Sequence, residues 1–134
     1  MRSPRSTRVN AERKVEESEV RRPLLALDGG NINDGVLASA IEICRRGAWR
    51  LDILVATTKS ASFLLGRFLM QLEKEGILFR LTKAAGPLGQ EIVRYIGQHP
   101  GISLIMVDGR DKLNAGFNEA LGPLNGQCQV ALLG

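Results

Sequence analysis

The chain has 134 residues, which is enough for one folded domain and leaves little for a second hydrophobic core. Hydrophobic residues make up 44% and charged residues 24%, values that are typical of globular proteins and exclude a wholly disordered chain. The longest apolar runs are far shorter than the ~20 residues of a membrane-spanning helix. Residues 1–22 also lack the apolar centre of a secretory signal, so we expect no membrane association.

The positive charge is concentrated in the first 22 residues. They contain seven Lys or Arg and four Glu, whereas the other 112 residues contain 11 basic and 10 acidic groups. We therefore expect residues 1–22 to be a flexible basic tail, with a short helix over Ala11–Val20 as the alternative, and residues 23–134 to be the folded domain. A nearly neutral domain with six aromatic residues argues against nucleic-acid binding. Docking of a protein partner or an acidic surface by the tail stays open as an alternative role.

The two cysteines and the single histidine are poor candidates for a metal or redox site. Cys44 and Cys128 both lie in apolar surroundings, which predicts buried free thiols and a protein of the reducing cytoplasm. His99 lies next to a proline at the expected end of a helix, so a histidine-based metal site is not expected.

Short apolar runs alternate with helical patterns from Pro23 to the end of the chain. The apolar runs are bounded by glycine, proline or polar residues, which predicts buried strands. The helical segments place apolar residues one, three or four positions apart, and several of them end at glycine or proline. We expect strands over Leu24–Leu27, Leu51–Ala56, Ile77–Leu81, Ile102–Val107 and Cys128–Leu133. We expect helices from an Asn33 or Asp34 cap to a left-handed stop at Gly47, over Ser60–Glu75, from Pro87 to Pro100, and over Asn114–Leu121.

The alternation of strands and helices predicts an α/β fold. The strands are too apolar to have one face in water, so helices must cover both faces of a parallel sheet. The connections should be right-handed, because a right-twisted strand followed by a helix returns to the sheet in that way. We expect a doubly wound, Rossmann-like sheet of five parallel strands in the order 3-2-1-4-5.

In such a sheet, ligands bind beyond the carboxyl ends of the strands, where the strand order reverses. Here that crevice lies between two polar turns, Asp28-Gly29-Gly30-Asn31 and Asp108-Gly109-Arg110-Asp111. The glycines allow close approach of the backbone, Arg110 can grip a phosphate with two hydrogen bonds, and Asp28 can accept hydrogen bonds from a base or sugar. A magnesium ion between Asp28 and Asp108, or ordinary turn chemistry without a ligand, are the alternatives. The candidate ligand-binding residues of these turns are Asp28, Gly29, Gly30, Asp108, Gly109 and Arg110.

Several enzyme and nucleotide motifs are absent from the sequence. No Gly-x-Gly-x-x-Gly follows the first strand, there is no Gly-x-x-x-x-Gly-Lys-Ser/Thr phosphate loop, and there is no Gly-x-Ser-x-Gly turn. A Ser-His-Asp triad would need His99, which the pattern places at the end of the domain opposite the crevice. We therefore expect no catalytic residues and a protein that is not an enzyme.

The chain resembles a universal stress protein domain of the adenine nucleotide alpha hydrolase-like superfamily, over Arg22 to Leu133. The resemblance rests on Leu25–Gly30 at the end of the first strand, on Ala40-Ile41-Glu42 followed by Gly47, and on Leu104–Val107 before Gly109-Arg110. It implies a homodimeric, cytoplasmic module of the stress response, some relatives of which bind ATP. It also implies that Asp28 contacts the adenosine side of a nucleotide and that the backbone of Ala56 meets the adenine.

The phosphate-binding motif of that family does not carry over to this chain. ATP-binding members have Gly-x-x-Gly, nine residues and then Gly-Ser/Thr after the fourth strand. Here Val107-Asp108 stands where the first glycine is expected, and Glu119 lies ten residues beyond Gly109 without a Gly-Ser pair. We expect an altered crevice without ATP, and any binding of ATP or AMP to be weak and to use Asp28 and Arg110. A nucleotide enzyme of the pyrophosphatase-loop type is the alternative.

The last expected strand is apolar and carries no charge. An uncharged strand at the edge of a sheet favours pairing with a second copy of the chain. Val130 and Leu132 are therefore the predicted residues of a homodimer edge.

Overall fold

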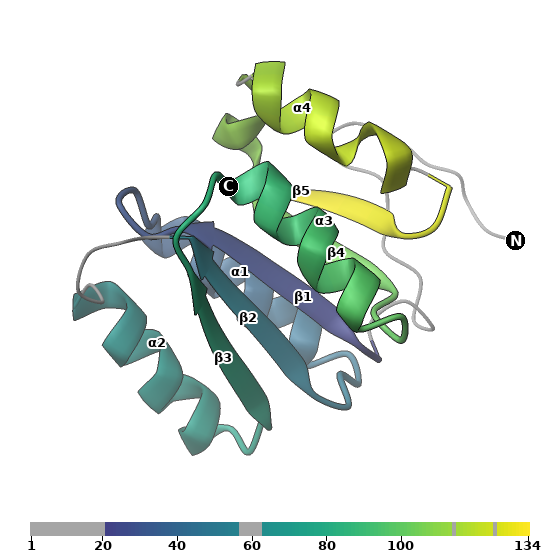
Figure 1. Ribbon diagram of the computed structural model, residues 1–134. Coiled ribbons are helices and arrows are strands. Elements are labelled where there is room, and N and C mark those ends of the chain that lie inside the picture. Colours follow the sequence, from purple (N-terminus) through teal and green to yellow (C-terminus); the bar gives the residue numbers. More distant parts are fainter. Residues whose placement is uncertain (1–20, 57–62, 114, 125) are drawn as a thin grey trace, which may run out of the picture.

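A computed structural model describes residues 21–56, 63–113, 115–124 and 126–134 (Figure 1). The predicted tail up to residue 20, including the alternative helix over Ala11–Val20, lies outside the described residues. So do the predicted start of the second helix, at residues 60–62, and that of the fourth helix, at residue 114.

Five parallel strands form one sheet in the order β3-β2-β1-β4-β5. The predicted fold class and strand order are therefore confirmed. In the register, Ala26 of β1 lies beside Leu54 of β2 on one side and Val107 of β4 on the other. The strands are β1 (Pro23–Asp28), β2 (Leu51–Ala56), β3 (Phe79–Ala84), β4 (Leu104–Asp108) and β5 (Gln129–Leu133).

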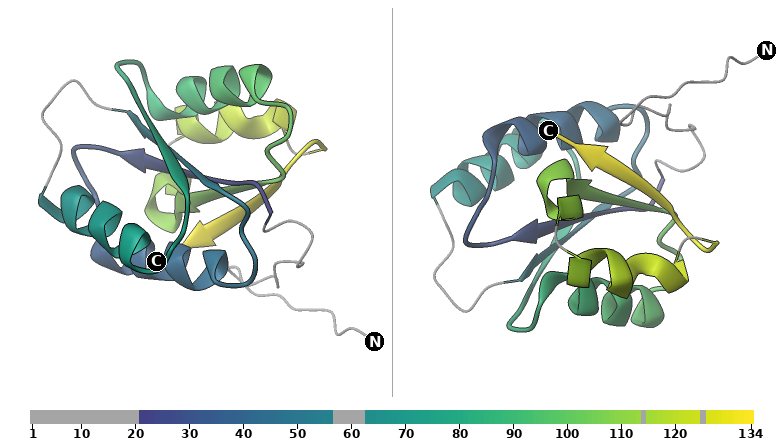
Figure 2. Two further views of the ribbon diagram at one scale, coloured as in Figure 1. Left: turned by 90° about the horizontal axis from the view of Figure 1, so that it is seen from below. Right: turned by 90° about the horizontal axis from the view of Figure 1, so that it is seen from above.

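The helices lie on both faces of the sheet, α1 and α2 on one and α3 and α4 on the other (Figure 2). Within the described residues, no helix is both long and apolar enough to cross a membrane. Two 3-10 segments, η2 (Gly109–Leu113) and η3 (Gly122–Leu124), flank the last helix. The α-helices are α1 (Asp34–Cys44), α2 (Phe63–Lys74), α3 (Leu88–Gln98) and α4 (Ala115–Leu121).

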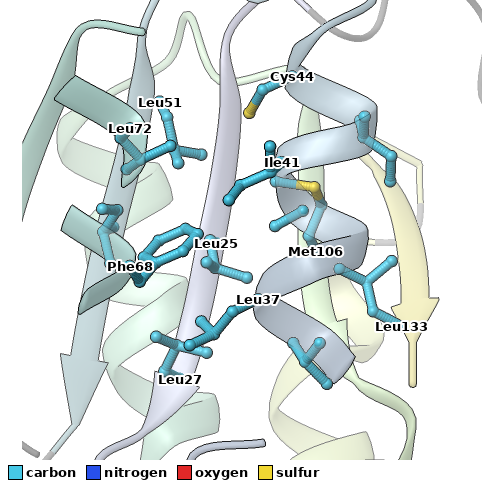
Figure 3. Packing of buried hydrophobic residues seen from close by; sticks show 14 of the residues in the cluster. Leu25, Leu27, Leu37, Ile41, Cys44, Leu51, Phe68, Leu72, Met106 and Leu133 are labelled. Atoms are coloured by element: carbon cyan, nitrogen blue, oxygen red, sulfur yellow. The ribbon is translucent and has the colours of Figure 1, made fainter. Parts of the chain in front are cut away.

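The alternation of side chains along each strand produces two hydrophobic cores. Leu25 and Leu27 of β1 pack toward α1 and α2, in the core of Figure 3, whereas Leu24 and Ala26 pack toward α3 and α4. All four side chains are almost fully buried. Both faces of the central strands are thus removed from water, which explains why these strands are apolar throughout.

Local signals fix the ends of α1 as predicted. The Asn33 side chain accepts hydrogen bonds from the backbone N–H groups of Gly35, at 2.7 Å, and Val36, at 3.3 Å, so Asn33 is the N-cap. Gly47 has a φ of +120°, which an L-residue with a side chain rarely adopts. The predicted left-handed stop at Gly47 is therefore confirmed.

The third strand begins two residues later than predicted. Gly76 has a φ of +73°, its N–H donates to the Glu73 carbonyl, and the Ile77 N–H donates to the Leu72 carbonyl at 2.9 Å. This pair of bonds is the Schellman cap of α2. Ile77 therefore belongs to the helix end, and β3 begins at Phe79 rather than at Ile77.

Cys44 and Cys128 are buried free thiols, as predicted. Burial raises the pKa of the Cys44 thiol to about 12 and raises that of Cys128 above its ordinary value. Both side chains are therefore held as neutral thiols with little nucleophilic character.

A buried hydrogen bond joins β2 to α3. Asp52 is fully buried, and its carboxylate accepts hydrogen bonds from the Tyr95 hydroxyl and, at 3.2 Å, from Arg50 Nε. A second hydroxyl, that of Thr82 on β3, bonds to the Tyr95 oxygen. Burial and the Asp52 carboxylate both raise the pKa of Tyr95, so its phenol is held in the donating, neutral form.

Replacing Tyr95 with Phe removes a donor from a carboxylate that has no access to water. We expect Tyr95→Phe to lower the free energy of unfolding by about 1–3 kcal/mol, measured by urea denaturation. The same change in an Asp52→Asn background should cost less, because the buried charge is gone. Equal losses in the two backgrounds would contradict this role of the hydroxyl.

Candidate functional site

The pairing of β1 with β4 brings the two predicted polar turns together. The strands run in parallel, with Leu25 opposite Met106 and Ala26 opposite Val107, so Asp28 and Asp108 leave the sheet at the same edge. Asp111 interacts electrostatically with both of these carboxylates. The two predicted turns therefore lie together where the strand order reverses, and their charged side chains form a cluster, which we call the crevice cluster of Asp28, Asp108, Arg110 and Asp111.

The first turn is held by its own hydrogen bonds. The Asp28 carboxylate accepts from the Gly30 N–H at 3.0 Å, and the Asp28 carbonyl accepts from the Asn31 N–H at 2.9 Å. The Gly29 N–H donates to the Ala56 carbonyl at 3.0 Å, which attaches this turn to the end of β2. Asp28 and Ala56, which the family resemblance relates to the adenosine side of a nucleotide, are thus neighbours, and Asp28 is exposed.

The second turn closes an ion pair on itself. Arg110 donates to Asp108 through its backbone N–H at 2.9 Å, through Nε to both carboxylate oxygens, and through Nη2 at 2.6 Å. Burial raises the pKa of the Asp108 carboxyl, but the bonds from Arg110 outweigh it and hold the pKa below its ordinary value. The Arg110 guanidinium, predicted to grip a phosphate, is therefore already bound by a carboxylate of its own turn.

Position 109 favours a glycine for a structural reason that the sequence did not indicate. A Cβ on Gly109 would lie 3.3 Å from the Leu133 carbonyl oxygen and 3.8 Å from the Leu132 side chain. The close approach at this glycine is thus to the end of β5 rather than to an open space for a ligand. At Gly30, an added Cβ would meet Asp28 at 3.6 Å, an ordinary contact, so that turn does not need a glycine for space.

Asp111 is the carboxylate of the crevice whose charge is least favoured by its surroundings. Its Oδ2 atom is buried and has no hydrogen-bond partner among the described residues. Burial, together with repulsion from Asp108 and Asp28, raises the pKa of the Asp111 carboxyl to about 6. Among the side chains that the structure describes, three carboxylates therefore share the crevice with one guanidinium, which gives a negative balance at neutral pH.

The crevice offers little to a metal ion. Among the described residues, no group of three or more His, Cys, Asp or Glu side chains is placed so that it could hold one. His99 lies at the opposite end of the sheet, where its ring stacks on Tyr95 with centroids 4.0 Å apart and its Nε2 lies 3.4 Å from Arg80 Nη1. Arg80 is near the start of β3, so this histidine is far along the strands from the crevice.

Sequence reasoning missed the polar groups that lie beside β3. Asp52 could have been found, because it is a single charge inside the otherwise apolar run Leu51–Ala56. Glu91 is also buried, at 7% exposure, but on the sequence it is an ordinary charged residue near the start of a helix. Its burial depends on the loop before α3, which no local pattern indicates.

Comparisons of this chain with protein-family models, with curated proteins and with solved structures found no match.

The raised pKa of Asp111 predicts a specific pH dependence of stability. A carboxyl whose folded pKa exceeds its unfolded value contributes stability that is fully present below about pH 4 and is lost as the pH rises through about 6. The Asp111→Asn variant lacks this loss. We expect the variant to gain stability relative to the wild type as the pH rises from 4 to 6, measured as the difference between their urea midpoints.

The matched control is Asp34→Asn, because Asp34 is an exposed residue in the first turn of α1. Its difference from the wild type should not follow the same course over this pH range. A pH-independent difference for Asp111→Asn would show that this carboxyl is not destabilised by its neighbours.

Proposed function

We propose that this chain is a non-enzymatic module similar to universal stress proteins, dimeric and cytoplasmic, with a crevice that does not accept a nucleoside triphosphate. The observation that carries the proposal is the Asp108–Arg110 ion pair, which engages the basic group of the crevice with three side-chain hydrogen bonds. Separating this pair to bind a phosphate would leave a nearly buried carboxylate without its partner. The buried free thiols are in keeping with a reducing compartment.

The remaining charges also oppose a triphosphate. Asp28 and Asp111 add two carboxylates to the crevice, and Glu119 is exposed on α4. The four charges of a triphosphate would meet this negative field without a compensating cation from the described residues nearby. The absence of the Gly-Ser pair after the second turn points in the same direction.

A nucleoside is the second candidate ligand, and one observation favours it. The Gly29–Ala56 hydrogen bond holds the exposed Asp28 carboxylate beside the end of β2, and only one Asp28 oxygen is used by the turn. A carboxylate in this place can accept hydrogen bonds from ribose hydroxyls. This geometry supports weak binding of adenosine or AMP more than it supports binding of ATP.

Thermal stabilisation by nucleotides tests the proposal directly. A ligand present at one hundred times its dissociation constant adds about 2.7 kcal/mol of stability. We expect millimolar ATP with magnesium to give no shift of the unfolding temperature, and adenosine or AMP to give a small shift that Asp28→Ala abolishes. A large, saturable shift with ATP would overturn the proposal, and turnover of ATP that depends on Asp28 would favour the pyrophosphatase-loop alternative.

The homodimer part of the proposal concerns β5. Among the described strands, β5 is at one edge of the sheet and pairs only with β4 (Figure 1), and its five residues carry no charge. Val130 and Leu132 are half-buried and pack against the core on the α3 and α4 side. An uncharged edge with unpaired backbone groups supports pairing with a second copy.

We expect the wild type to sediment as a dimer at micromolar concentration and Val130→Lys to sediment as a monomer, because a lysine on an edge strand opposes pairing with a second strand. The control is Val93→Lys, since Val93 is a partly buried valine of α3 that packs against the same core but lies away from the edge. The control should remain dimeric in analytical ultracentrifugation. A wild type that is already monomeric would refute the proposed interface.

A further inference from the structure

A cavity of about 330 Å³ lies between β3 and α3, away from the crevice of β1 and β4. It forms because α3 packs mainly on β1 and β2 and covers the edge strand β3 only in part on this face of the sheet. Ala84 and Ala85 provide an apolar surface, and the buried Leu54 of β2 lies beneath it. Thr82, Arg94 and Gln98 provide polar groups around it.

A buried carboxylate fixes the basic group of this cavity. Glu91 is only 7% exposed, and its Oε2 accepts a hydrogen bond from the Gly86 N–H at 3.1 Å. A Cβ on Gly86 would lie 2.4 Å from the same oxygen, so a residue with a side chain could not hold the carboxylate in this position. Both carboxylate oxygens accept from Nη1 of Arg94, at 3.0 and 3.2 Å.

The ion pair uses one nitrogen of Arg94 and leaves the others open. Nε and Nη2 make no hydrogen bond with the described residues, and the side chain is 65% exposed at the rim of the cavity. The amide of Gln98, one helical turn further along α3, also has no partner among the described residues. A held guanidinium and a free amide on the same helix are donors suited to an anionic group.

The charged residues around the cavity also favour an anionic ligand. Arg80 is exposed and interacts electrostatically with Tyr95, which lines the cavity, so it adds a second guanidinium nearby. Glu91, the acidic residue of the lining, is already neutralised by Arg94, and the buried Asp52 is paired with Arg50 and Tyr95. An anion at the rim therefore meets unbalanced positive charge.

We propose that this cavity is a second ligand site that binds a small organic anion, a carboxylate or a phosphate monoester. Arg94 and Gln98 bind the anionic group, and the body of the ligand lies against Ala84 and Ala85. The volume is at the lower end of the range of about 300–1,000 Å³ for ligand pockets, which selects a molecule no larger than a single substituted ring. The site shares no residue with the crevice, so it stands independently of the nucleotide question.

Titration of the labelled full chain by two-dimensional NMR tests this site, with benzoate and phenyl phosphate as probes and benzyl alcohol as the neutral comparison. We expect saturable shifts of amide signals over residues 82–86 and 91–98, and none in the turns that begin at Asp28 and Asp108. The neutral probe should bind at least about tenfold more weakly, because it lacks the charge-assisted bonds. Benzoate and phenyl phosphate distinguish a carboxylate site from a phosphate site.

Three variants separate the role of Arg94 in anion binding from its role in folding. Arg94→Gln should weaken binding of the anions by about tenfold or more, but it also leaves Glu91 without its partner. Arg94→Lys keeps the charge without the planar fork, and Gln98→Ala leaves the ion pair intact; both should weaken binding several-fold. Arg67→Gln is the control, because Arg67 is an exposed arginine of α2 on the other face of the sheet.

The proposal is overturned if the shifts map to the crevice, if none of the probes saturates, or if Arg94→Lys and Gln98→Ala bind the anions as tightly as the wild type does. None of these outcomes bears on ATP or adenosine binding at Asp28, which is measured separately.

Discussion

The parallel pairing of β1 with β4 is the constraint on which the rest of the structure depends. It joins two strands that are 75 or more residues apart in the chain and places them at the centre of the sheet, so their carboxyl ends are neighbours. The polar turns that follow must therefore begin at the same end of the sheet. The helices that return from them cover opposite faces. The meeting of Asp28 and Asp108 at one edge is thus a consequence of topology.

Once the turns meet, the balance of charge decides what the crevice accepts. An arginine that follows a strand can bind either a ligand or a carboxylate of its own turn. Here Arg110 is bound by the Asp108 carboxylate. Asp111 then lies among like charges, and its Oδ2 atom has no partner among the described residues, at a cost to stability. Perturbed pKa values of this kind are common at functional sites. The doubly wound architecture thus brings the two turns together, and the charges of the described side chains there are mostly negative.

The part of the structure that follows from short-range patterns could be predicted from the sequence. The bounds of β2, the Asn33 cap and the stop at Gly47 each depend on a few adjacent residues. The start of β3 could not be predicted, since Ile77 is apolar both as a strand residue and as the contact of a helix cap. The ion pair of the crevice and the Glu91–Arg94 pair depend on how loops fold back, which the residue types alone leave open.

The two edges of the sheet differ in a way that separates self-association from ligand binding. On β3, Arg80 and Lys83 are exposed, and charges of this kind protect an edge from pairing with another strand. On β5 no residue is charged. A second copy is therefore expected on the β5 side alone, and the cavity beside β3 stays open in a dimer. The same charged edge that prevents strand pairing supplies the positive field which draws a small anion toward Arg94.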